Sequence, residues 1–122
     1  HAVDAVTGRA LWRHPNPNIC GDREYCDPGV SAATTAIPGA VIAGHLDGWL
    51  RAYSRDDGKL IWSWDTTQPV RSVNGQTGHG GGMSGPGAAV YGGRLVVNSG
   101  YGMYYHMPGN VLLVFEKQGA AK

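Results

Sequence analysis

The sequence lacks the features that mark several classes of protein. None of its apolar runs approaches the roughly 20 residues that cross a bilayer, so we predict no membrane span. Ten Lys and Arg residues stand against nine Asp and Glu residues, which leaves no basic surface for nucleic acid or an anionic membrane. No signal peptide opens the chain, and it begins with His1 rather than Met. We therefore expect a processed or truncated chain, or a piece cut from a longer one.

Helical periodicity is absent as well, and the composition explains why. The chain contains 20 Gly and 7 Pro among its 122 residues. An interior Gly costs a helix roughly 1 kcal/mol and a Pro about 3 kcal/mol, so long helices are disfavoured. Hydrophobic residues make up 42% of the chain, which is too many for a disordered tail and supports a packed core. We therefore predict an all-β fold.

An alanine, a glycine and a tryptophan recur along the chain at a spacing of 50 residues. The repeated positions are Ala2, Gly8 and Trp12, followed by Ala52, Gly58 and Trp62. Each copy has the pattern of a strand, a tight turn at Thr7-Gly8 or Asp57-Gly58, and a second strand that ends in tryptophan. Glycine is favoured in such turns because it accepts a positive φ without penalty. The repeat predicts two copies of one β-hairpin.

The segments between these hairpins have the alternating patterns of further strands, four to a unit, which we name A to D from the inside outward. The sequence predicts strands C and D of one unit in 1–14, a full unit in 30–66, and strands A to C of a last unit in 85–116. Radially repeated four-stranded sheets are the blades of a β-propeller. The prediction is thus a partial β-propeller of about two and a quarter antiparallel blades.

So few blades cannot close a ring, and open sheet edges invite pairing with foreign strands. We therefore expect other blades to complete the propeller, supplied by the same parent chain or by another subunit. An independent domain that closes its own ring by oligomerising is the weaker alternative.

The pattern Ala-x-Asp-x-x-Thr-Gly-x-x-x-Trp, complete in 2–12 and degraded in 52–62, resembles the tryptophan-docking motif of eight-bladed quinoprotein dehydrogenases. In that family the tryptophan stacks on the neighbouring blade. Other parts of the chain resemble the C-terminal blades of polyvinyl-alcohol-dehydrogenase-like proteins of the pyrroloquinoline quinone (PQQ) group. These parts are 37–41, 46–53, 97–102 and 107–113. The resemblance assigns the six repeated Ala, Gly and Trp residues to blade docking.

The resemblance also implies a function. The chain would be the C-terminal portion of a PQQ-dependent dehydrogenase in the periplasm or another extracytoplasmic compartment. Such an enzyme oxidises an alcohol by hydride transfer to the quinone, and the electrons leave to a partner such as a cytochrome c. Ca²⁺ would be held by residues outside this chain. The alternative is a non-catalytic scaffold, because PQQ-type repeats also occur in propellers that bind partner proteins in extracytoplasmic assemblies.

Three long connections, 15–30, 66–85 and 99–110, are predicted to lie on one face, because all the other turns are minimal. Long loops in a compact domain are usually functional or disordered, so this face is the predicted binding face.

The glycine-rich connection 71–85 leads into an A strand, and A strands line the central channel of a propeller. Its glycines allow the backbone to approach a ligand closely. In the resembling dehydrogenases equivalent loops help to floor the PQQ site, which implies that Arg71, Asn74 and His79 face the cofactor. The alternative is that the glycines merely permit a tight crossing of the chain.

Alcohol oxidation of this kind needs a carboxylate base. Members of the resembling family carry an Asp just before the Gly-Pro-Gly stretch, where this sequence has Ser84. Asp65, at the end of a predicted D strand, is a candidate substitute, although a structural role is the favoured interpretation. Either the base lies in the missing blades or the site is inactive.

Cys20 and Cys26 are the two cysteines of the chain. The extracytoplasmic location of the resembling proteins implies a disulfide between them. A reduced metal pair is the alternative, but two further Cys or His at zinc spacing are missing. The Cys-x-x-Cys-His sequence that attaches a c-type haem is also absent from this stretch, so any cytochrome would be elsewhere.

The last long connection gathers aromatic residues with one histidine and two methionines. They are Tyr101, Met103, Tyr104, Tyr105, His106 and Met107. A copper site formed by His106 and the methionines is conceivable, because thioethers favour Cu(I). The other interpretations are an aromatic wall at the channel mouth, a partner contact, or packing of the loop on itself.

Overall fold

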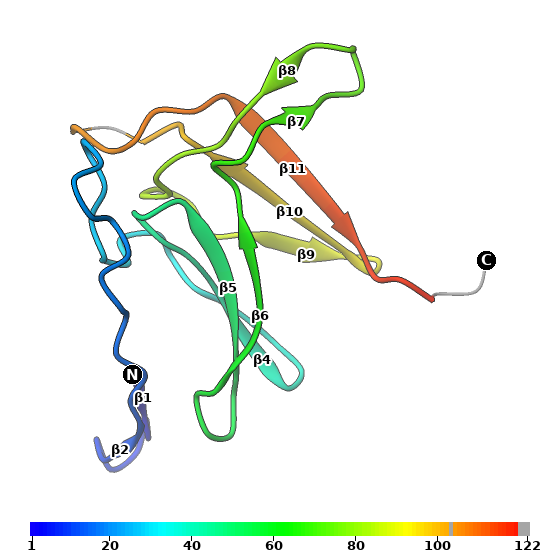
Figure 1. Cartoon of the computed structure of the whole chain (residues 1–122). Coiled ribbons are helices and arrows are strands. Elements are labelled where there is room, and N and C mark those ends of the chain that lie inside the picture. Colours follow the sequence, from blue (N-terminus) through cyan, green and yellow to red (C-terminus); the bar gives the residue numbers. More distant parts are fainter. Residues whose placement is uncertain (103, 120–122) are drawn as a thin grey trace.

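The computed structural model describes residues 1–102 and 104–119, and within these ranges it contains strands and no helix (Figure 1). The predicted all-β class is therefore confirmed. The described residues form eleven strands in four antiparallel sheets. They accordingly include no helix that is long and apolar enough to span a membrane.

The strands, in chain order, are β1 (Ala2–Val3), β2 (Ala10–Trp12), β3 (Thr35–Ile37), β4 (Ala40–Gly44), β5 (Trp49–Ser54), β6 (Leu60–Asp65), β7 (Val70–Arg71), β8 (Thr77–Gly78), β9 (Ala89–Tyr91), β10 (Arg94–Ser99) and β11 (Val111–Glu116).

The largest sheet joins β3, β4, β5 and β6 in sequence order. Its three turns are tight because Gly39, Gly48 and Gly58 take positive φ values of 80°, 85° and 71°. A second sheet joins β9, β10 and β11, again between sequence neighbours. Sheets of four and three strands in this order are consistent with propeller blades.

The hairpins β1–β2 and β5–β6 have the same geometry. Across each hairpin the repeated alanine stands opposite the repeated tryptophan, Ala2 opposite Trp12 and Ala52 opposite Trp62. The turn glycine has a φ of 71° in both hairpins, and its N–H donates to the carbonyl four residues earlier, at 2.8 and 2.9 Å. The repeat found in the sequence therefore corresponds to two copies of one folded unit.

Trp12 connects its own hairpin to the turn of the next one. Its indole Nε1 donates a hydrogen bond of 2.8 Å to the carbonyl oxygen of Arg55. The ring lies directly against Gly58, where an added Cβ would come within 2.4 Å of a ring carbon. Position 58 thus requires glycine for two reasons, the positive φ and the space that the indole occupies.

Trp62 reaches the following sheet by a different contact. Its ring meets the edge of Phe115 on β11, with the ring centroids 5.3 Å apart. Trp64, two residues further along β6, also meets Phe115, at 5.6 Å. The two repeated tryptophans therefore both contact the next sheet, Trp12 at a glycine turn and Trp62 at an aromatic ring.

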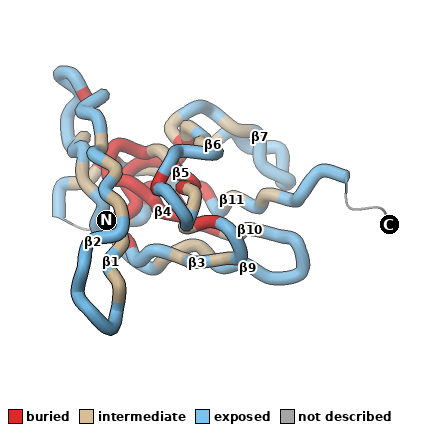
Figure 2. Tube along the Cα trace, turned by 90° about the horizontal axis from the view of Figure 1, so that it is seen from below, coloured by how far each residue is buried: buried red, intermediate tan, exposed pale blue. Residues whose placement is uncertain are grey.

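The hydrophobic core lies between the four-stranded and the three-stranded sheet. Its buried members are Ala32, Ile42, Leu50, Ala52, Met83 and Val97. Figure 2 shows that burial concentrates around β4 and β5, while the β1–β2 hairpin and the C-terminal segment remain exposed.

The three long connections gather at one end of the molecule, opposite the β5–β6 turn, and they cover the β4–β5 turn at Gly48 (Figure 1). Backbone hydrogen bonds join them: Met107 N donates to Tyr25 O at 3.1 Å, and Gly82 N donates to Met107 O at 2.9 Å. The prediction that these connections share one face is confirmed.

The connection 66–85 is more regular than the sequence analysis expected. Residues 70–71 and 77–78 pair as the short hairpin β7–β8, which projects from the loop end of the molecule (Figure 1). Gly75 supplies the bend with a φ of 84°, and Ser72 O accepts its N–H at 2.9 Å. Asn-Gly at positions 74 and 75 is a strong hairpin signal that the analysis of this loop did not use.

The two turn glycines allow a matched test of the tryptophan contact. Gly8→Ala introduces a Cβ at a φ of 71° with no atom within 4 Å, so we expect a loss of roughly 1 kcal/mol from backbone strain alone. Gly58→Ala has the same φ but drives the Cβ into Trp12, and overpacking adds about 1–3 kcal/mol. Urea unfolding measures both variants. An equal loss of the free energy of unfolding in the two variants would show that the contact of Trp12 with position 58 contributes nothing to stability.

Candidate functional site

Two of the three predicted cofactor residues share a surface hollow. Arg71 on β7 and Asn74 in the β7–β8 turn border a hollow of about 630 Å³, together with Tyr101, Asn110 and the side chains of β11. His79 follows β8 and is not among the residues that line this hollow. The structure thus brings Arg71 and Asn74 to one concave surface and leaves His79 outside it.

One side-chain atom of Asn74 and one of His79 bond to neighbouring residues. The side-chain oxygen of Asn74 accepts hydrogen bonds from the Ser72 hydroxyl and from Gln76 N, which close the hairpin turn. The ring Nδ1 of His79 lies 2.8 Å from Gly80 O, and its backbone N–H donates to the Asn110 side chain at 3.2 Å. Contact of these residues with a cofactor remains a prediction.

The glycines of this connection permit close crossing of the backbone. A Cβ at Gly81 would come within 2.2 Å of Met107 O, and one at Gly109 within 2.5 Å of the Gly80 carbonyl carbon. Ser99 fixes the crossing, because its hydroxyl bonds to both the N–H and the carbonyl of Gly81 at 3.0 and 2.9 Å. The geometry therefore favours the packing interpretation of these glycines.

Neither position considered for the catalytic base suits that role. Ser84 has no carboxylate, and the carboxylate of Asp65 is hydrogen-bonded to its neighbours. Ser84 borders a small hollow of about 20 Å³, enough for a single water molecule. Asp65 accepts hydrogen bonds from Thr67 N, the Thr67 hydroxyl and Gln68, at 3.0, 2.6 and 2.9 Å. Burial works to raise the pKa of Asp65, but these bonds outweigh it and hold the pKa below its ordinary value. Asp65 thus has a structural role, and a weakened basicity does not suit proton abstraction.

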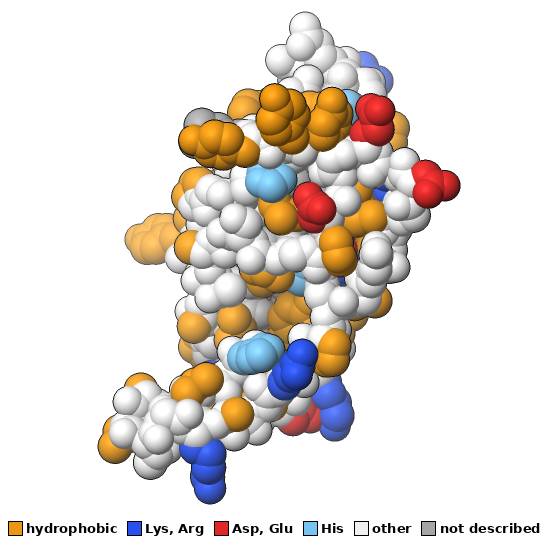
Figure 3. All heavy atoms as spheres, turned by 90° about the vertical axis from the view of Figure 1, so that its left-hand side faces the viewer, with side chains coloured by type: hydrophobic (Ala, Val, Ile, Leu, Met, Phe, Trp, Pro, Cys, Tyr) orange, Lys and Arg blue, Asp and Glu red, His pale blue; other side chains and the backbone are white. Residues whose placement is uncertain are grey.

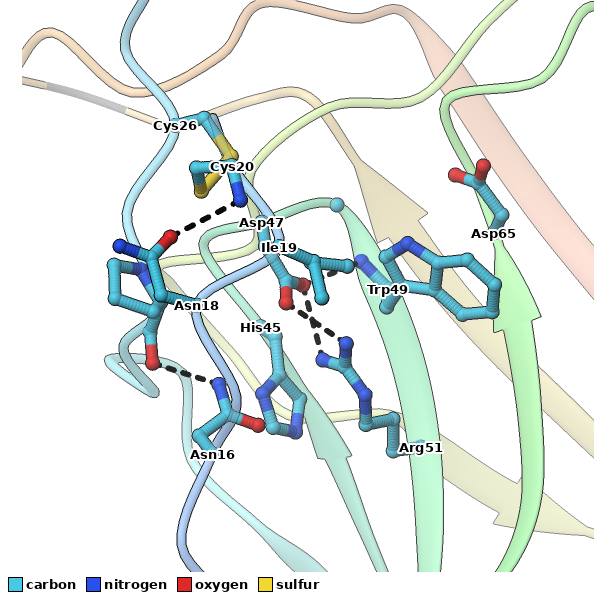
Figure 4. Close-up of polar contacts among 12 residues, drawn as sticks. Asn16, Asn18, Ile19, Cys20, Cys26, His45, Asp47, Trp49, Arg51 and Asp65 are labelled. Carbon is cyan, nitrogen blue, oxygen red and sulfur yellow. Dashed lines mark hydrogen bonds and ion pairs between the residues drawn. A yellow bond between two sulfur atoms is a disulfide. The ribbon is translucent and has the colours of Figure 1, made fainter. Parts of the chain in front are cut away.

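A buried ion pair beneath the loops was missed by the sequence analysis. Both guanidinium nitrogens of Arg51 bond to the carboxylate of Asp47, at 3.0 and 2.8 Å, and both residues are buried (Figure 4). Asp47 also accepts the N–H of Trp49 at 3.0 Å, and the guanidinium lies 5.5 Å from the centre of the Trp49 ring. This bidentate pair fixes the turn between β4 and β5.

The signal for this pair was present but ambiguous. The segment Leu46-Asp47-Gly48-Trp49 was interpreted only as a tight turn, and Arg51 only as a polar position of an alternating strand. An Asp in a turn and an Arg four residues later are common on surfaces. Their burial follows from the loops that cover the turn, which local sequence does not show.

His45 lies next to this pair and is almost completely buried. Its Nε2 lies 3.1 Å from the Tyr53 hydroxyl, and its Nδ1 has no hydrogen-bond partner within residues 1–102 and 104–119. The pKa of His45 is lowered to about 4. Burial is the largest cause, and the positive charge of Arg51 adds to it. The Asp47 carboxylate raises the pKa, but by less than Arg51 lowers it. The imidazole is therefore neutral in the folded protein at neutral pH.

A groove beside His45 collects further polar groups. It has a volume of about 350 Å³ and is bordered by His14, Asn16, His45 and Tyr53 together with the apolar side chains of β3 and β4. The side-chain oxygen of Asn16, like His45 Nδ1, has no hydrogen-bond partner among the residues that the structure describes. Figure 4 shows Asn16 beside the His45 ring.

Cys20 and Cys26 form a disulfide, as the resemblance implied. The bond lies under the loop end, with Cys20 buried and the Asn18 side chain accepting its N–H at 3.1 Å (Figure 4). The structure offers no support for a metal pair, because the residues it describes contain no group of three or more His, Cys, Asp or Glu that could hold an ion. The copper alternative involves Met103, which lies outside the described residues.

Comparison with known proteins gives relatives of one kind. The chain is 39% identical to a polyvinylalcohol dehydrogenase of Pseudomonas sp, over 98% of the chain and 20% of that protein. It is 38% identical to a polyvinylalcohol dehydrogenase of Sphingopyxis sp. (strain 113P3), over 82% of the chain and 16% of that protein. These relatives are alcohol dehydrogenases. A third, the quinohemoprotein alcohol dehydrogenase ADH IIB of Pseudomonas putida, is 34% identical over 94% of the chain and 18% of its own length.

The chain spans about a fifth of the length of these relatives. No family model matches it, so the repeat family remains a prediction. The similarity supports a dehydrogenase role in general terms, and the quinohemoprotein among these relatives supports PQQ in the parent group.

The described residues do not form a complete quinone site. PQQ carries three carboxylates, whereas the hollow beside β7–β8 offers a single guanidinium, that of Arg71. The side-chain oxygen of Asn74 is already bonded within its turn. No carboxylate lines this hollow or the small one beside Ser84. We therefore assign no step of an oxidation to the residues of this chain.

The neutral state of His45 predicts a pH dependence of stability. The unfolded chain takes up a proton at this histidine near pH 6.5, whereas the folded chain does so only near pH 4. The free energy of unfolding will therefore fall as the pH drops through this window, by on the order of 2–3 kcal/mol from His45.

Urea unfolding at pH 7, 6, 5 and 4 measures this dependence. In His45→Gln the fall over the window will be shallower than in the natural protein, while His79→Gln, at an exposed position, will leave it unchanged. An equally steep fall in His45→Gln would contradict the assignment.

Proposed function

We propose that this chain forms the C-terminal blades of a PQQ-dependent alcohol dehydrogenase with a β-propeller fold. The observation that carries the proposal is the 39% identity to a polyvinylalcohol dehydrogenase over 98% of the chain. The repeated hairpin unit and the tryptophan contact between consecutive sheets support the propeller.

In this proposal the chain contributes part of the channel wall and helps to close the propeller ring. It does not contribute the full set of catalytic residues. Ala2, Gly8 and Trp12, and their repeats Ala52, Gly58 and Trp62, dock each sheet on the next. The contact of Trp12 with Gly58 supports this role for the first copy, and that of Trp62 with Phe115 for the second.

The glycine-rich connection would border the cofactor. Arg71 would supply one positive charge at the edge of the quinone, and Asn74 would border the same hollow, whereas His79 would have to meet the cofactor from outside that hollow. The remaining contacts, the Ca²⁺ ion and the base that removes the alcohol proton would come from residues outside this chain. When bound, the quinone supplies the acceptor for the hydride.

The partners of the chain follow from its uncovered surfaces. β11 has β10 on one side and no strand on the other among the described residues, and Leu112 and Val114 on it are exposed. Further blades would cover this edge, and a cytochrome c would accept the electrons. The disulfide supports an oxidising, extracytoplasmic compartment such as the periplasm.

The test is the quinone content and activity of the native protein. We expect purified protein to show quinone absorbance, and protein stripped of cofactor to regain dye-linked oxidation of an alcohol when PQQ and Ca²⁺ are added. Arg71→Ala will weaken PQQ binding about tenfold, the effect of losing one charge-assisted contact. Arg94→Ala, at an exposed ion pair with Glu116 at the β9–β10 turn, serves as the control.

An intact protein that neither contains nor binds PQQ would contradict the proposal. Ser84, in place of the expected Asp, is the observation that favours the alternative, a non-catalytic scaffold. In that case the protein would bind partner proteins and show no alcohol oxidation with added cofactor.

A further inference from the structure

The groove beside His45 has no part in the function proposed above. It has a volume of about 350 Å³ and lies between the β1–β2 hairpin and strands β3 and β4. His1 and Thr34 border it in addition to the four polar residues described earlier, but no Asp, Glu, Lys or Arg does. Figure 3 shows this side of the molecule, where hydrophobic and histidine side chains lie between the loop end at the top and the hairpin at the bottom. A groove without charged side chains suits an apolar occupant.

The floor of the groove is one face of the four-stranded sheet. Ala36, Val41 and Tyr53 stand opposite one another across β3, β4 and β5, so they lie on one face, and we call them the groove row. The next residue along β4, Ile42, lies on the opposite face and belongs to the hydrophobic core. Ala36 is exposed and Val41 is half-buried, so the face with the groove row is only partly covered.

The three-stranded sheet contains a row in the same place. Leu95 on β10 stands opposite Phe115 on β11, as Val41 on β4 stands opposite Tyr53 on β5. In both sheets the N–H two residues beyond the aromatic ring donates to the carbonyl oxygen of the first turn glycine at 3.1 Å, from Arg55 to Gly39 and from Lys117 to Gly93. The two sheets therefore follow one plan, and the covering of Phe115 indicates how Tyr53 is covered.

Phe115 is covered by two elements of the preceding sheet. Trp62 and Trp64 of β6 meet its ring, with centroid distances of 5.3 and 5.6 Å. Phe115 and Leu95 also pack on the core cluster to which Ile42 of β4 contributes. A complete contact thus has an aromatic part from the last strand of the preceding sheet and an aliphatic part from its inner strands.

Tyr53 has only the aromatic part of this contact. The ring of His14 lies 4.8 Å from the Tyr53 ring, and Trp12 borders the same groove. At the spacing of 50 residues these two residues correspond to the two tryptophans that meet Phe115. The aliphatic part is missing, because β1 has β2 on one side and no strand on the other among the described residues. The groove therefore lies where the inner strands of a preceding sheet would pack.

A second copy of the chain does not offer the missing strand. The strand that β1 lacks would hold the place that β4 holds beside β5. Within residues 1–102 and 104–119 the two strands in this place, β4 and β10, are each paired on both sides. The chain spans about a fifth of the length of its relatives, so the parent polypeptide is the source with enough further strands.

We propose that the groove is the seat of a strand pair of the parent polypeptide, in the places of β3 and β4, of which one strand pairs with the free edge of β1. An aliphatic side chain of this pair, in the place of Ile42, packs on the groove row. Because β3 and β4 precede β5 along the chain, the pair precedes β1. The inference rests on the proposed function, in which this chain is part of a longer propeller, and it names the same polypeptide as the source of the neighbouring sheet.

Chemical labelling of histidines in the native parent protein tests whether the groove is filled. We expect diethyl pyrocarbonate to modify His14 about tenfold more slowly than the exposed His79, because the strand pair covers the groove and only local opening exposes it. His45 is buried with or without the pair, so its labelling reports unfolding of a variant. Equal labelling of His14 and His79, with His45 unmodified, would overturn the inference.

A matched pair of variants tests the contact with the groove row. Val41→Asn places a polar but uncharged group under the strand pair, so we expect it to raise the labelling rate of His14 severalfold. Val73→Asn makes the same change at the fully exposed tip of the β7–β8 hairpin and will leave that rate unchanged. An unchanged rate in Val41→Asn would contradict packing of the pair on this row.

A photo-crosslinker identifies the occupant. With Thr34→p-benzoylphenylalanine, at an exposed position on the border of the groove, we expect coupling within one polypeptide to the segment that precedes β1. The same group at position 73 will not couple to that segment. Coupling to a second copy or to another protein, or no coupling at position 34, would overturn the inference.

These measurements require neither a quinone nor an alcohol, so they separate the inference from the proposed function. A protein that protects His14 but does not bind PQQ would contradict the dehydrogenase and leave the strand pair in place. A protein that binds PQQ while its groove is open to the label would contradict the strand pair alone.

Discussion

The contact between the Trp12 indole and the turn at Gly58 is the constraint on which the arrangement of the sheets depends. The indole can approach only because position 58 has no side chain, and the turn can form only because the same residue tolerates a φ of 71°. One residue thus serves the turn of its own hairpin and the packing of the preceding one. The second hairpin reaches the next sheet by a different contact, between Trp62 and Phe115.

This packing determines at which end of the molecule a functional site can form. Hairpins that dock through their turns need short turns, so the extra chain length gathers at the opposite end. Apart from the β7–β8 hairpin, that end is held by buried polar groups. The Asp47–Arg51 pair fixes one turn, and the hydroxyls of Thr66 and Ser99, 2.7 Å apart, join two connections. Loops fixed in this way can present side chains in defined positions at a surface without regular secondary structure.

The sequence predicted the features that depend on local pattern. The repeated hairpins followed from alanine, glycine and tryptophan at a constant spacing, and the strand order followed from short turns. The disulfide came from the family resemblance. The hairpin β7–β8 was missed because a glycine-rich segment was treated as irregular, although Asn74-Gly75 marked its turn. The buried state of His45 and of the Asp47–Arg51 pair was not predictable, because the covering residues come from other connections.

The predicted cofactor residues show the same limit of prediction from local sequence. Arg71, Asn74 and His79 were chosen for their residue types within one segment. In the structure the side-chain oxygen of Asn74 closes a turn, and the ring of His79 bonds to its neighbouring carbonyl. Residue type indicates what a side chain is able to bind. Only the fold shows which of its polar groups are still free.

Hydrogen exchange in the native protein tests the propeller most directly. The outward-facing amides of β11 have no strand beside them within the described residues. If further blades complete the ring and its last sheet, these amides will exchange as slowly as those of β5, which lies between two strands. Fast exchange along this edge of β11, with β5 still protected, would contradict the account.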